Sequence, residues 1–388
     1  MSETHPNPRL NPVLLISPVE DGYVAYDPQR DWLHTLNPIA ALLAELSDGS
    51  RTRDDIRALV APLLPEGKAG TVDQWFENGK KIGLLTEETG GDAAREFSAA
   101  ELLAVVKKLR EVGDLQAAWV CCKRVTELAP ENWDAWYDLG DIAHCLGKRD
   151  EAREAYAVYF KAHPEDGEIE HLLIALGSGG ATPPRASDQA ILTIYKSFAA
   201  SYDERMRQDL KYVGPEKLME LTLPHLGSRT GLRVMDMGCG SGFAGTVLRP
   251  LAADLTGVDL SPEMVELSRA RNLYDKLDVA EITEWLNRGG EPFDLIFSSD
   301  CLIYFGDLTT ILTAAGKRLK PGGVFAFSNE RGTRPPFHLT DTGRYTHTPE
   351  HARDAAAKAG LKLLDQQESF LRMEWGEDVI GLYTVLGK

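Results

Sequence analysis

The feature that most constrains the fold is a glycine-rich turn between an apolar strand and a helix, at Val234-Met-Asp-Met-Gly-Cys-Gly-Ser-Gly242. Residues 232–235 have the largely apolar and β-branched character of a buried strand, and residues 243–248 can begin a helix. A strand, a glycine turn and a helix in this order are typical of loops that hold a nucleotide-like ligand. The pattern predicts an open α/β sheet with a ligand at the carboxyl ends of its strands.

The spacing of the glycines separates this turn from a dinucleotide fingerprint. That fingerprint, G-x-G-x-x-G, has a third glycine where the helix packs closely on the strand, and Phe243 stands there in this chain. The glycines are instead Gly238, Gly240 and Gly242. Asp259 ends the next predicted strand, where an acid can accept hydrogen bonds from two ribose hydroxyls.

Strands and helices alternate from residue 188 to residue 388, which predicts a parallel sheet covered on both faces. We predict strands at 232–236, 254–258, 275–280, 293–298, 323–328, 361–366 and 380–386, with a helix at 350–359 before the last two. The fold class is therefore a Rossmann-like, seven-stranded domain within a multidomain α/β chain.

These features resemble the class I S-adenosylmethionine-dependent methyltransferases, in which the glycine turn approaches the methionine half of the cofactor and the acid after the second strand holds its ribose. The resemblance implies that S-adenosylmethionine is bound by Tyr202, Asp236, Gly238, Cys239, Gly240, Gly242, Asp259, Leu260, Met264, Glu281, Ile282 and Ser299. Asp278 competes with Glu281 for the adenine. The alternatives are an ordinary glycine turn of another α/β domain, or a site for NAD.

The loop after the fourth strand bears on the chemistry. Its sequence, residues 298–307, replaces the N-P-P-Y type of loop seen in amide and exocyclic-amine methyltransferases, which disfavours adenine in DNA or glutamine as acceptor. We predict catalytic roles for Asp300 and Tyr304, with a helix cap and a core aromatic as the alternatives. His347 is the predicted general base, because an unperturbed imidazole titrates near neutrality.

Other residues are predicted to contact the substrate. His338 is the second candidate base, and Arg344 could anchor a carboxylate through its planar guanidinium. Ahead of the domain, Tyr195 to Asp203 and Leu210 to Pro215 resemble the lid helices of the tetratricopeptide-linked methyltransferase group, which implies substrate contacts for Tyr195 and Tyr212. That resemblance covers residues 99–388.

Residues 99–166 contain an internal repeat, because Ala118 and Pro130 recur as Ala152 and Pro164 with the same period of 34. The second copy follows the tetratricopeptide pattern more closely than the first. Helical repeats of this kind are predicted over 99–177, and a linker at 177–184 precedes the catalytic domain at 188–388. The repeats could bind a partner or only space the domains.

The amino-terminal segment, residues 8–90, reads as three short strands followed by three helices at 38–46, 52–63 and 72–82, which is winged-helix-like. Its motifs, chiefly residues 26–37, 46–52 and 82–85, resemble the PqqD-like family, whose members recognise the leader of a ribosomally made precursor peptide by adding it as a strand to a sheet edge. The resemblance implies a groove flanked by Trp32, Leu33, Leu36, Trp75, Phe76 and Lys80. The alternative is that these apolar residues are core.

Composition excludes several classes of function. A chain of 388 residues with 43% hydrophobic and 26% charged residues is typical of a globular protein with two or three domains. A net charge of −17 argues against a nucleic-acid partner. The five cysteines have no C-x-x-C spacing, so we predict no disulfide frame and no metal site. Lacking a signal peptide and a long apolar stretch, the chain is predicted to be cytoplasmic, with no membrane partner.

The favoured hypothesis is a methyltransferase that modifies a ribosomally synthesised precursor peptide in natural-product maturation, guided by its leader. The leader peptide is the predicted partner, together with other tailoring enzymes of the same pathway. A methyltransferase of a small molecule or protein, with a purely structural amino-terminal domain, is the second hypothesis. A non-catalytic repeat adaptor with a pocket that senses the cofactor is the third.

Overall fold

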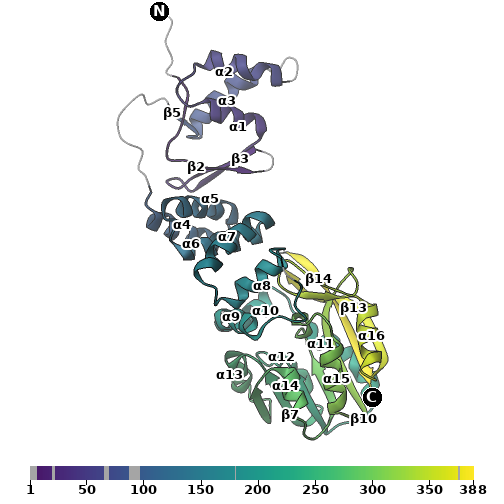
Figure 1. The fold of residues 1–388 in the computed structure, drawn as a ribbon. Coiled ribbons are helices and arrows are strands. Elements are labelled where there is room, and N and C mark those ends of the chain that lie inside the picture. Colours follow the sequence, from purple (N-terminus) through teal and green to yellow (C-terminus); the bar gives the residue numbers. More distant parts are fainter. Residues whose placement is uncertain (1–6, 20–21, 65–69, 87–96, 180, 375) are drawn as a thin grey trace, which may run out of the picture. The chain divides into compact units, whose positions relative to one another are not determined.

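A computed structural model describes residues 7–19, 22–64, 70–86, 97–179, 181–374 and 376–388. The chain divides into two compact units, Met1–Ala162 and His163–Lys388 (Figure 1). Residues 87–90 of the predicted amino-terminal domain and residue 180 of the predicted linker lie outside the described residues. Among the described helices, none combines the length and apolar character needed to span a membrane.

The first unit begins with a small antiparallel sheet in the order β2-β3-β4, followed by three helices. Its elements are β1 (Arg9–Leu10), β2 (Leu15–Val19), β3 (Gly22–Asp27), β4 (Trp32–Leu36), α1 (Pro38–Leu46), α2 (Arg53–Val60), a 3-10 turn (Ala61–Leu63), α3 (Gly70–Lys81) and β5 (Leu85–Thr86). α1 and α2 begin where the sequence predicts because Asn37 and Thr52 cap them, each accepting a backbone N–H bond. The pairing of β1 with β5 was not predicted.

Two helix pairs complete the first unit, and their starts are 34 residues apart, as the sequence repeat requires. The helices are α4 (Ala99–Val112), α5 (Leu115–Leu128), α6 (Trp133–Cys145) and α7 (Arg149–Ala162). Ala118 and Ala152, the matched small residues of the repeat, are both fully buried. A side chain at Gly140 would collide with the ring of Tyr156, so the close approach of α6 and α7 needs glycine there.

The second unit begins earlier than the predicted catalytic domain. α8 (Gly167–Ala175) belongs to it, and His171 on this helix lies with its Nε2 2.8 Å from the carbonyl oxygen of Gly343. The remaining helices are α9 (Asp188–Phe198), a 3-10 turn (Ala199–Ser201), α10 (Tyr202–Gln208), α11 (Gly214–Leu226), α12 (Phe243–Leu248), α13 (Pro262–Ala270), α14 (Ile282–Asn287), a 3-10 turn (Leu302–Tyr304), α15 (Thr309–Arg318) and α16 (Pro349–Lys358).

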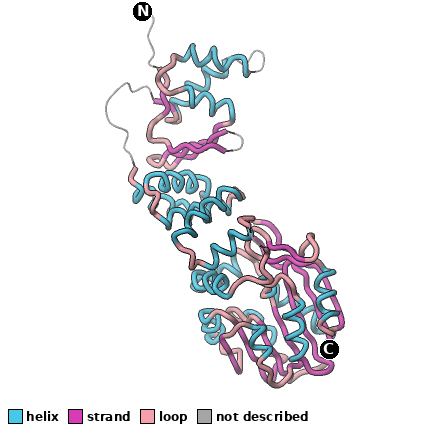
Figure 2. Tube along the Cα trace, in the orientation of Figure 1, coloured by secondary structure: helices cyan, strands magenta, loops and turns pink. Residues whose placement is uncertain are grey.

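One mixed sheet forms the centre of the second unit, with helices on both of its faces (Figure 2). Its strands are β6 (Leu232–Met237), β7 (Ala252–Asp259), β8 (Lys276–Val279), β9 (Phe293–Ser298), β10 (Leu319–Arg331), β11 (Phe337–Leu339), β12 (Tyr345–His347), β13 (Lys362–Glu374) and β14 (Glu377–Gly387). The central order is β8-β7-β6-β9-β10-β14-β13, in which β14 is antiparallel to both of its neighbours. The predicted Rossmann-like sheet is confirmed, and its last strand is antiparallel to the others in this order.

The prediction of seven strands was incomplete, because the sheet has nine. The hairpin of β11 and β12 pairs with the last two residues of β10, beyond the end of β9. Alternate residues of the central strands pack on opposite faces, so that Met235 and Phe325 belong to one apolar cluster while Val234 and Val324 belong to the other. Both faces of the sheet are therefore buried, which explains the near-continuous apolar runs in its strands.

Candidate active site

A cavity of about 150 Å³ lies at the carboxyl ends of β6, β7, β8 and β9, closed by residues of α9 and α10 and by the segment that follows α10. This is the edge at which open α/β sheets bind their ligands. The predicted cofactor-binding residues that line it are Tyr202, Gly238, Gly240, Asp259, Leu260, Glu281, Ile282 and Ser299. The predicted catalytic and substrate residues that line it are Tyr195, Tyr212, Asp300, Tyr304 and Arg344.

The glycine turn leaves backbone exposed to the cavity. Gly238 and Gly240 have φ angles of +72° and +53°. Residues other than glycine, asparagine and aspartate rarely adopt φ angles in this region. A Cβ atom at Gly238 would collide with the side chain of Cys301. At Gly240 a Cβ atom would meet only the hydroxyl of Tyr202, at 3.9 Å, so this position offers open backbone to a ligand.

Asp259 ties the end of β7 to this turn. Its Oδ2 accepts the backbone N–H of Gly240 at 2.8 Å, and its Oδ1 accepts the backbone N–H of Ser261 at 2.9 Å. Burial raises the pKa of the carboxyl, while these backbone donors act in the opposite direction. Each oxygen has lone pairs beyond those used, so the carboxylate remains able to accept hydrogen bonds from a ligand.

The competition between Glu281 and Asp278 is resolved by position. Glu281 lines the cavity and caps α14, where its carboxylate accepts the backbone N–H of Glu284 at 2.8 Å. Asp278 is not among the lining residues, and it accepts the indole N–H of Trp285 at 2.8 Å. The geometry therefore favours Glu281 as the acid nearest a bound ligand.

Four predicted cofactor ligands lie behind the cavity instead of lining it. Asp236 is fully buried and accepts the hydroxyl of Tyr274 at 2.6 Å, and burial raises the pKa of its carboxyl to about 7. The other three are Cys239, Gly242 and Met264, none of which reaches the cavity lining. The cavity lining does not include these four residues, so direct contact with the cofactor stays a prediction for them.

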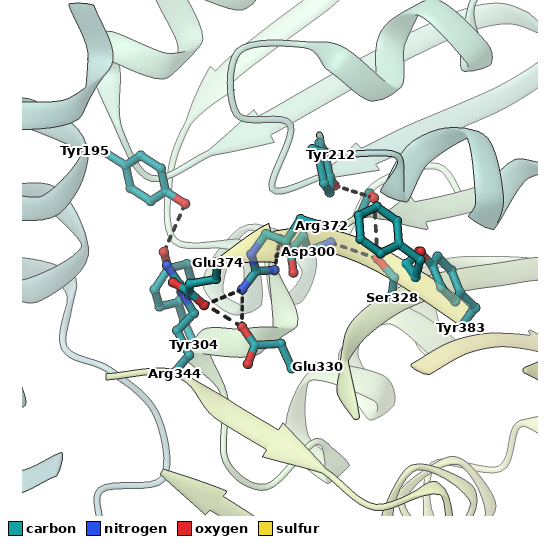
Figure 3. Close-up of polar contacts among 12 residues, drawn as sticks. Tyr195, Tyr212, Asp300, Tyr304, Ser328, Glu330, Arg344, Arg372, Glu374 and Tyr383 are labelled. Atoms are coloured by element: carbon teal, nitrogen blue, oxygen red, sulfur yellow. Dashed lines mark hydrogen bonds and ion pairs between the residues drawn. The ribbon is translucent and has the colours of Figure 1, made fainter. Parts of the chain in front are cut away.

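The other end of the cavity holds a network of tyrosines and charged groups (Figure 3). The hydroxyls of Tyr195 and Tyr304 lie 3.0 Å apart, and the hydroxyl of Tyr212 lies 2.7 Å from Oγ of Ser299. Burial raises the pKa of each of these tyrosines, so their hydroxyls stay protonated at neutral pH.

Five charged side chains form what we term the Asp300 cluster: Asp300, Glu330, Arg344, Arg372 and Glu374. The guanidinium of Arg372, only 2% exposed, donates to Oδ2 of Asp300 at 2.6 Å and to Oε1 of Glu330. Arg344 is paired with Glu374. Figure 3 shows Arg372 between Asp300 and Glu330, so that one buried cation holds two carboxylates.

His347 does not support the role of general base. It is fully buried, it is not among the cavity-lining residues, and its Nε2 lies 2.8 Å and 3.0 Å from the carbonyl oxygens of Phe305 and Gly306. Since carbonyls only accept, Nε2 carries the proton. Burial also lowers the pKa of His347 to about 4, and the ring stacks on His351 at 5.7 Å. The structure assigns it to packing.

His338 is likewise outside the cavity lining. Its Nε2 lies 3.0 Å from a guanidinium nitrogen of Arg334, on the hairpin of β11 and β12. The prediction that it contacts substrate is not supported by this position. The segment 343–348 still contributes to the site, but through Arg344.

The predicted peptide groove of the first unit divides into exposed and buried residues. Trp32 on β4 is 49% exposed, and among the described residues β4 is an edge strand that pairs with β3 alone. Leu33, Trp75 and Lys80 are partly exposed. Leu36 and Phe76 belong to the apolar cores beneath, at 5% and 0% exposure, so for these two the alternative of a core role holds.

Sequence reasoning missed Arg372, Glu330 and Glu374. A usable signal was present, because Arg372 and Glu374 are opposite charges two residues apart in a strand and so share one face. The predicted strand at 361–366 stopped short of them, whereas β13 runs to Glu374. Glu330 was missed for the same reason, since β10 extends past the predicted end at residue 328.

Comparison with known proteins places residues 228–375 in a family described as methyltransferase domain. A ubiquinone biosynthesis O-methyltransferase of Brucella anthropi is 29% identical over 154 residues, covering 35% of this chain and 62% of that protein. One of Cereibacter sphaeroides is 30% identical over 155 residues, covering 35% of this chain and 63% of that protein. The chain thus spans less than two thirds of the length of these relatives.

Solved structures similar to the chain include an S-adenosylmethionine-dependent methyltransferase from Mesorhizobium loti, with a TM-score of 0.35, 22% identity, and coverage of 45% of this chain and 98% of that one. Another is a 1,6-didemethyltoxoflavin-N1-methyltransferase of Burkholderia thailandensis with bound S-adenosylhomocysteine, with a TM-score of 0.42 and 20% identity. It covers 54% of this chain and 92% of that one.

Proposed function

We propose that this protein transfers a methyl group from S-adenosylmethionine to a ribosomally synthesised precursor peptide, and the match of residues 228–375 to a methyltransferase-domain family supports the methyl transfer. The observation that carries the activity is the cavity at the strand ends, where the open backbone of Gly240, the carboxylate of Asp259 and Glu281 meet. The edge strand β4 of the first unit supports a peptide as the acceptor of the methyl group.

The residues present fit this cofactor. The exposed backbone of Gly238 and Gly240 suits the close approach of the methionine half, and Asp259 has acceptor capacity left for ribose hydroxyls. Glu281 and Ile282 offer an acceptor and an apolar surface to the adenine. Tyr202 covers the turn from the opposite side.

The bound cofactor supplies an electrophilic methyl group on a sulfonium. What the chain has to supply is orientation, which in well-aligned systems is worth on the order of 7–11 kcal/mol. Tyr195, Tyr202 and Tyr304 narrow the space open to an acceptor, since the ring centroid of Tyr195 lies 6.0 Å from that of Tyr202 and 6.2 Å from that of Tyr304.

The peptide part of the proposal rests on β4 in the first unit. An edge strand presents unpaired backbone groups to which an extended peptide can add as a further strand. Trp32 at the start of β4 is a large, half-exposed aromatic of the kind that anchors bound peptides. A peptide held there would be presented to the catalytic unit at high effective concentration through the intervening chain.

A small molecule with a hydroxyl group is the second candidate acceptor. The curated relatives are named O-methyltransferases of ubiquinone biosynthesis, and a transfer to oxygen on a small molecule would need no peptide-binding strand. The two candidates differ in whether the first unit contributes to catalysis. A third, the cofactor-sensing adaptor, would bind S-adenosylmethionine and yield no methylated product.

The activity is tested by calorimetric titration of the full chain with S-adenosylhomocysteine, followed by incubation with S-adenosylmethionine carrying a labelled methyl group. The acceptor probe is a phage-displayed library of random peptides selected on the full chain. We expect selected peptides to bind the wild type and to gain label. Absence of S-adenosylhomocysteine binding would refute the activity, and binding without label on any selected peptide would favour the other two candidates.

The role of β4 is tested with Trp32→Ala against a matched control, Leu59→Ala. Leu59 lies on α2 in the same unit and is 54% exposed, close to the 49% of Trp32. We expect selected peptides to bind Trp32→Ala at least about tenfold more weakly, because a central aromatic anchor contributes about 2 kcal/mol or more. Equal binding to wild type and to both variants would remove β4 from the proposal.

A further inference from the structure

We propose that the Asp300 cluster forms an acceptor subsite for an uncharged hydroxyl group on an apolar, aromatic body, and that Asp300 takes the proton of this hydroxyl. The inference rests on the proposed methyl transfer and names the class of acceptor group. For a peptide, the corresponding group is the phenol of a tyrosine side chain. Glu330, Arg372 and Glu374 of the cluster were not predicted from the sequence.

The first observation is that the two carboxylate oxygens of Asp300 differ in their hydrogen bonds. Asp300 lines the cavity, and 10% of its side chain is exposed. Oδ2 is held by Arg372 at 2.6 Å, whereas Oδ1 has no hydrogen-bond partner within the described part of the chain. A buried carboxylate oxygen without a donor is costly, and a ligand that donates a hydrogen bond would remove that cost.

The backbone at Asp300 is held in an uncommon conformation that places this side chain. Its φ is +58°, and its N–H donates to Oγ of Ser328 at 3.0 Å. Oγ of Ser328 lies 3.4 Å from Oγ of Ser299, which in turn contacts Tyr212. Aspartate adopts this left-handed region more readily than most residues, and these hydrogen bonds hold the loop that carries Asp300.

The charge of the cluster limits what it can accept. Three carboxylates face two guanidiniums, which leaves one net negative charge in a largely buried site. The sulfonium of the donor carries one positive charge, while its amino and carboxylate groups cancel. The sulfonium therefore cancels the net charge of the Asp300 cluster, and a cationic amine or an anionic carboxylate placed beside the cluster would add an uncompensated buried charge. An uncharged acceptor avoids that cost.

The surroundings of Asp300 in the cavity are apolar and aromatic, which suits a planar apolar acceptor more than a sugar or an aliphatic alcohol. Besides the tyrosines already described, the lining includes Ile191, Ile194, Met206, Leu210, Ile303 and Phe305.

The transfer balances without any further reactant. The O–H bond of the acceptor breaks and its proton goes to Oδ1 of Asp300, while an oxygen electron pair forms the new bond to the methyl carbon. The bond between that carbon and sulfur breaks, and its pair stays on sulfur. One positive and one negative charge disappear together, which a low-dielectric site favours.

Arg372 acts in this scheme as a positioning residue. It fixes Oδ2 of Asp300 and so aims Oδ1. The pKa of Asp300 is raised to about 6: burial is the largest cause, Arg372 opposes the rise, and Glu330 adds to it. At neutral pH Asp300 is thus ionised and close to the range in which a general base is effective. The groups facing Asp300 are Tyr202, Tyr212, Tyr304, Glu330, Arg344, Arg372, Glu374 and Tyr383.

The first test measures the charge of Asp300 without any acceptor. Calorimetry gives the affinities of the full chain for S-adenosylmethionine and for S-adenosylhomocysteine between pH 5 and pH 8. Their ratio isolates the sulfonium, because the two ligands share every other ionisable group. We expect the ratio to shift about fivefold or more towards S-adenosylmethionine as pH rises through about 6, by linkage to the ionisation of Asp300.

Substitutions at Asp300 and Arg372 assign that shift. Asp300→Asn should remove the change in the ratio near pH 6, whereas the matched control Asp307→Asn, in the same loop but outside the cavity lining, should keep the wild-type profile. Arg372→Gln should move the midpoint to higher pH, and Arg372→Lys should restore it in part. A flat wild-type ratio, or a profile unchanged by Asp300→Asn, would overturn the charge role; Arg372→Lys remains informative if Arg372→Gln does not fold.

The second test identifies the acceptor class, with p-cresol and 4-methylbenzylamine as probes of similar shape and different charge. Both are titrated into the chain saturated with sinefungin, an unreactive analogue of S-adenosylmethionine whose additional amino group supplies the positive charge of the sulfonium. We expect p-cresol to bind at least about tenfold more tightly than the amine, and to lose that preference in Asp300→Asn. No binding of p-cresol, or tighter binding of the amine, would sink the hydroxyl assignment. Failure of S-adenosylhomocysteine to bind at all would instead sink the proposed methyl transfer.

Discussion

Replacing Asp259 is the sharpest test of the cofactor site, because this carboxylate has two separable roles. It holds the glycine turn through the N–H groups of Gly240 at 2.8 Å and Ser261 at 2.9 Å, and it would accept the ribose hydroxyls of the cofactor. Hydrogen bonds to a charged group are worth about 1.5–3 kcal/mol each. Losing the two hydrogen bonds from the ribose hydroxyls should therefore cost about 3–6 kcal/mol of binding free energy.

That cost corresponds to an affinity for S-adenosylhomocysteine about 10² to 10⁴ times weaker in Asp259→Ala. Asp259→Asn keeps one acceptor oxygen, so one ribose contact survives. Its affinity for S-adenosylhomocysteine should be about 10 to 100 times weaker than that of the wild type. The measurement is calorimetric titration of each folded variant, with unfolding followed in parallel by circular dichroism.

Asp275→Asn is the matched control. Asp275 also accepts a backbone N–H beside β7, from Leu255 at 2.8 Å, but it does not line the cavity. We expect this variant to lose some stability while its affinity for S-adenosylhomocysteine stays within threefold of wild type. If folded Asp259→Ala also stays within threefold, the assignment of Asp259 to the ribose is refuted.

Three further outcomes follow from the structure. Burial lowers the pKa of His347 to about 4, so between pH 6.5 and pH 4 the histidine takes up a proton in the unfolded chain but not in the folded one. The free energy of unfolding should therefore fall by up to about 3 kcal/mol as the pH drops from 6.5 to 4. Urea unfolding of His347→Gln should lack this pH dependence. Gly238→Ala should abolish S-adenosylhomocysteine binding in calorimetry, because its φ is +72° and its Cβ would meet Cys301; wild-type affinity would contradict this. Gly140→Ala should destabilise the first unit by about 1–3 kcal/mol against the ring of Tyr156, measured by thermal unfolding, with cofactor affinity unchanged.

Local sequence patterns predicted the elements well where one residue type decides the backbone. The capping residues Asn37 and Thr52 set the starts of α1 and α2, and the period of 34 reappears in the spacing of the helix pairs. The glycine turn, with Asp259 at the end of the next strand, was sufficient to place the cofactor cavity. These signals are readable because capping, positive φ and strand burial are properties of short segments.

The ends of the longer strands were not predictable in the same way. β10 and β13 continue beyond their apolar cores into charged residues, because Arg372 neutralises Glu330 across the sheet and Arg344 neutralises Glu374. Local propensity does not favour buried charges in a strand, and only the partner across the sheet makes them stable.

By itself, the sequence determined that this chain has a sheet with a cofactor turn, two matched helix pairs and a small amino-terminal sheet. Only the tertiary structure decided which side chains reach the cavity. His347 is buried in the core, where its Nε2 lies beside two carbonyl oxygens. Asp300, in the loop after β9, is paired with Arg372 of β13, which is distant in the chain. The physical reason is that exposure to a cavity and the pairing of buried charges depend on residues distant in sequence, which no local pattern records.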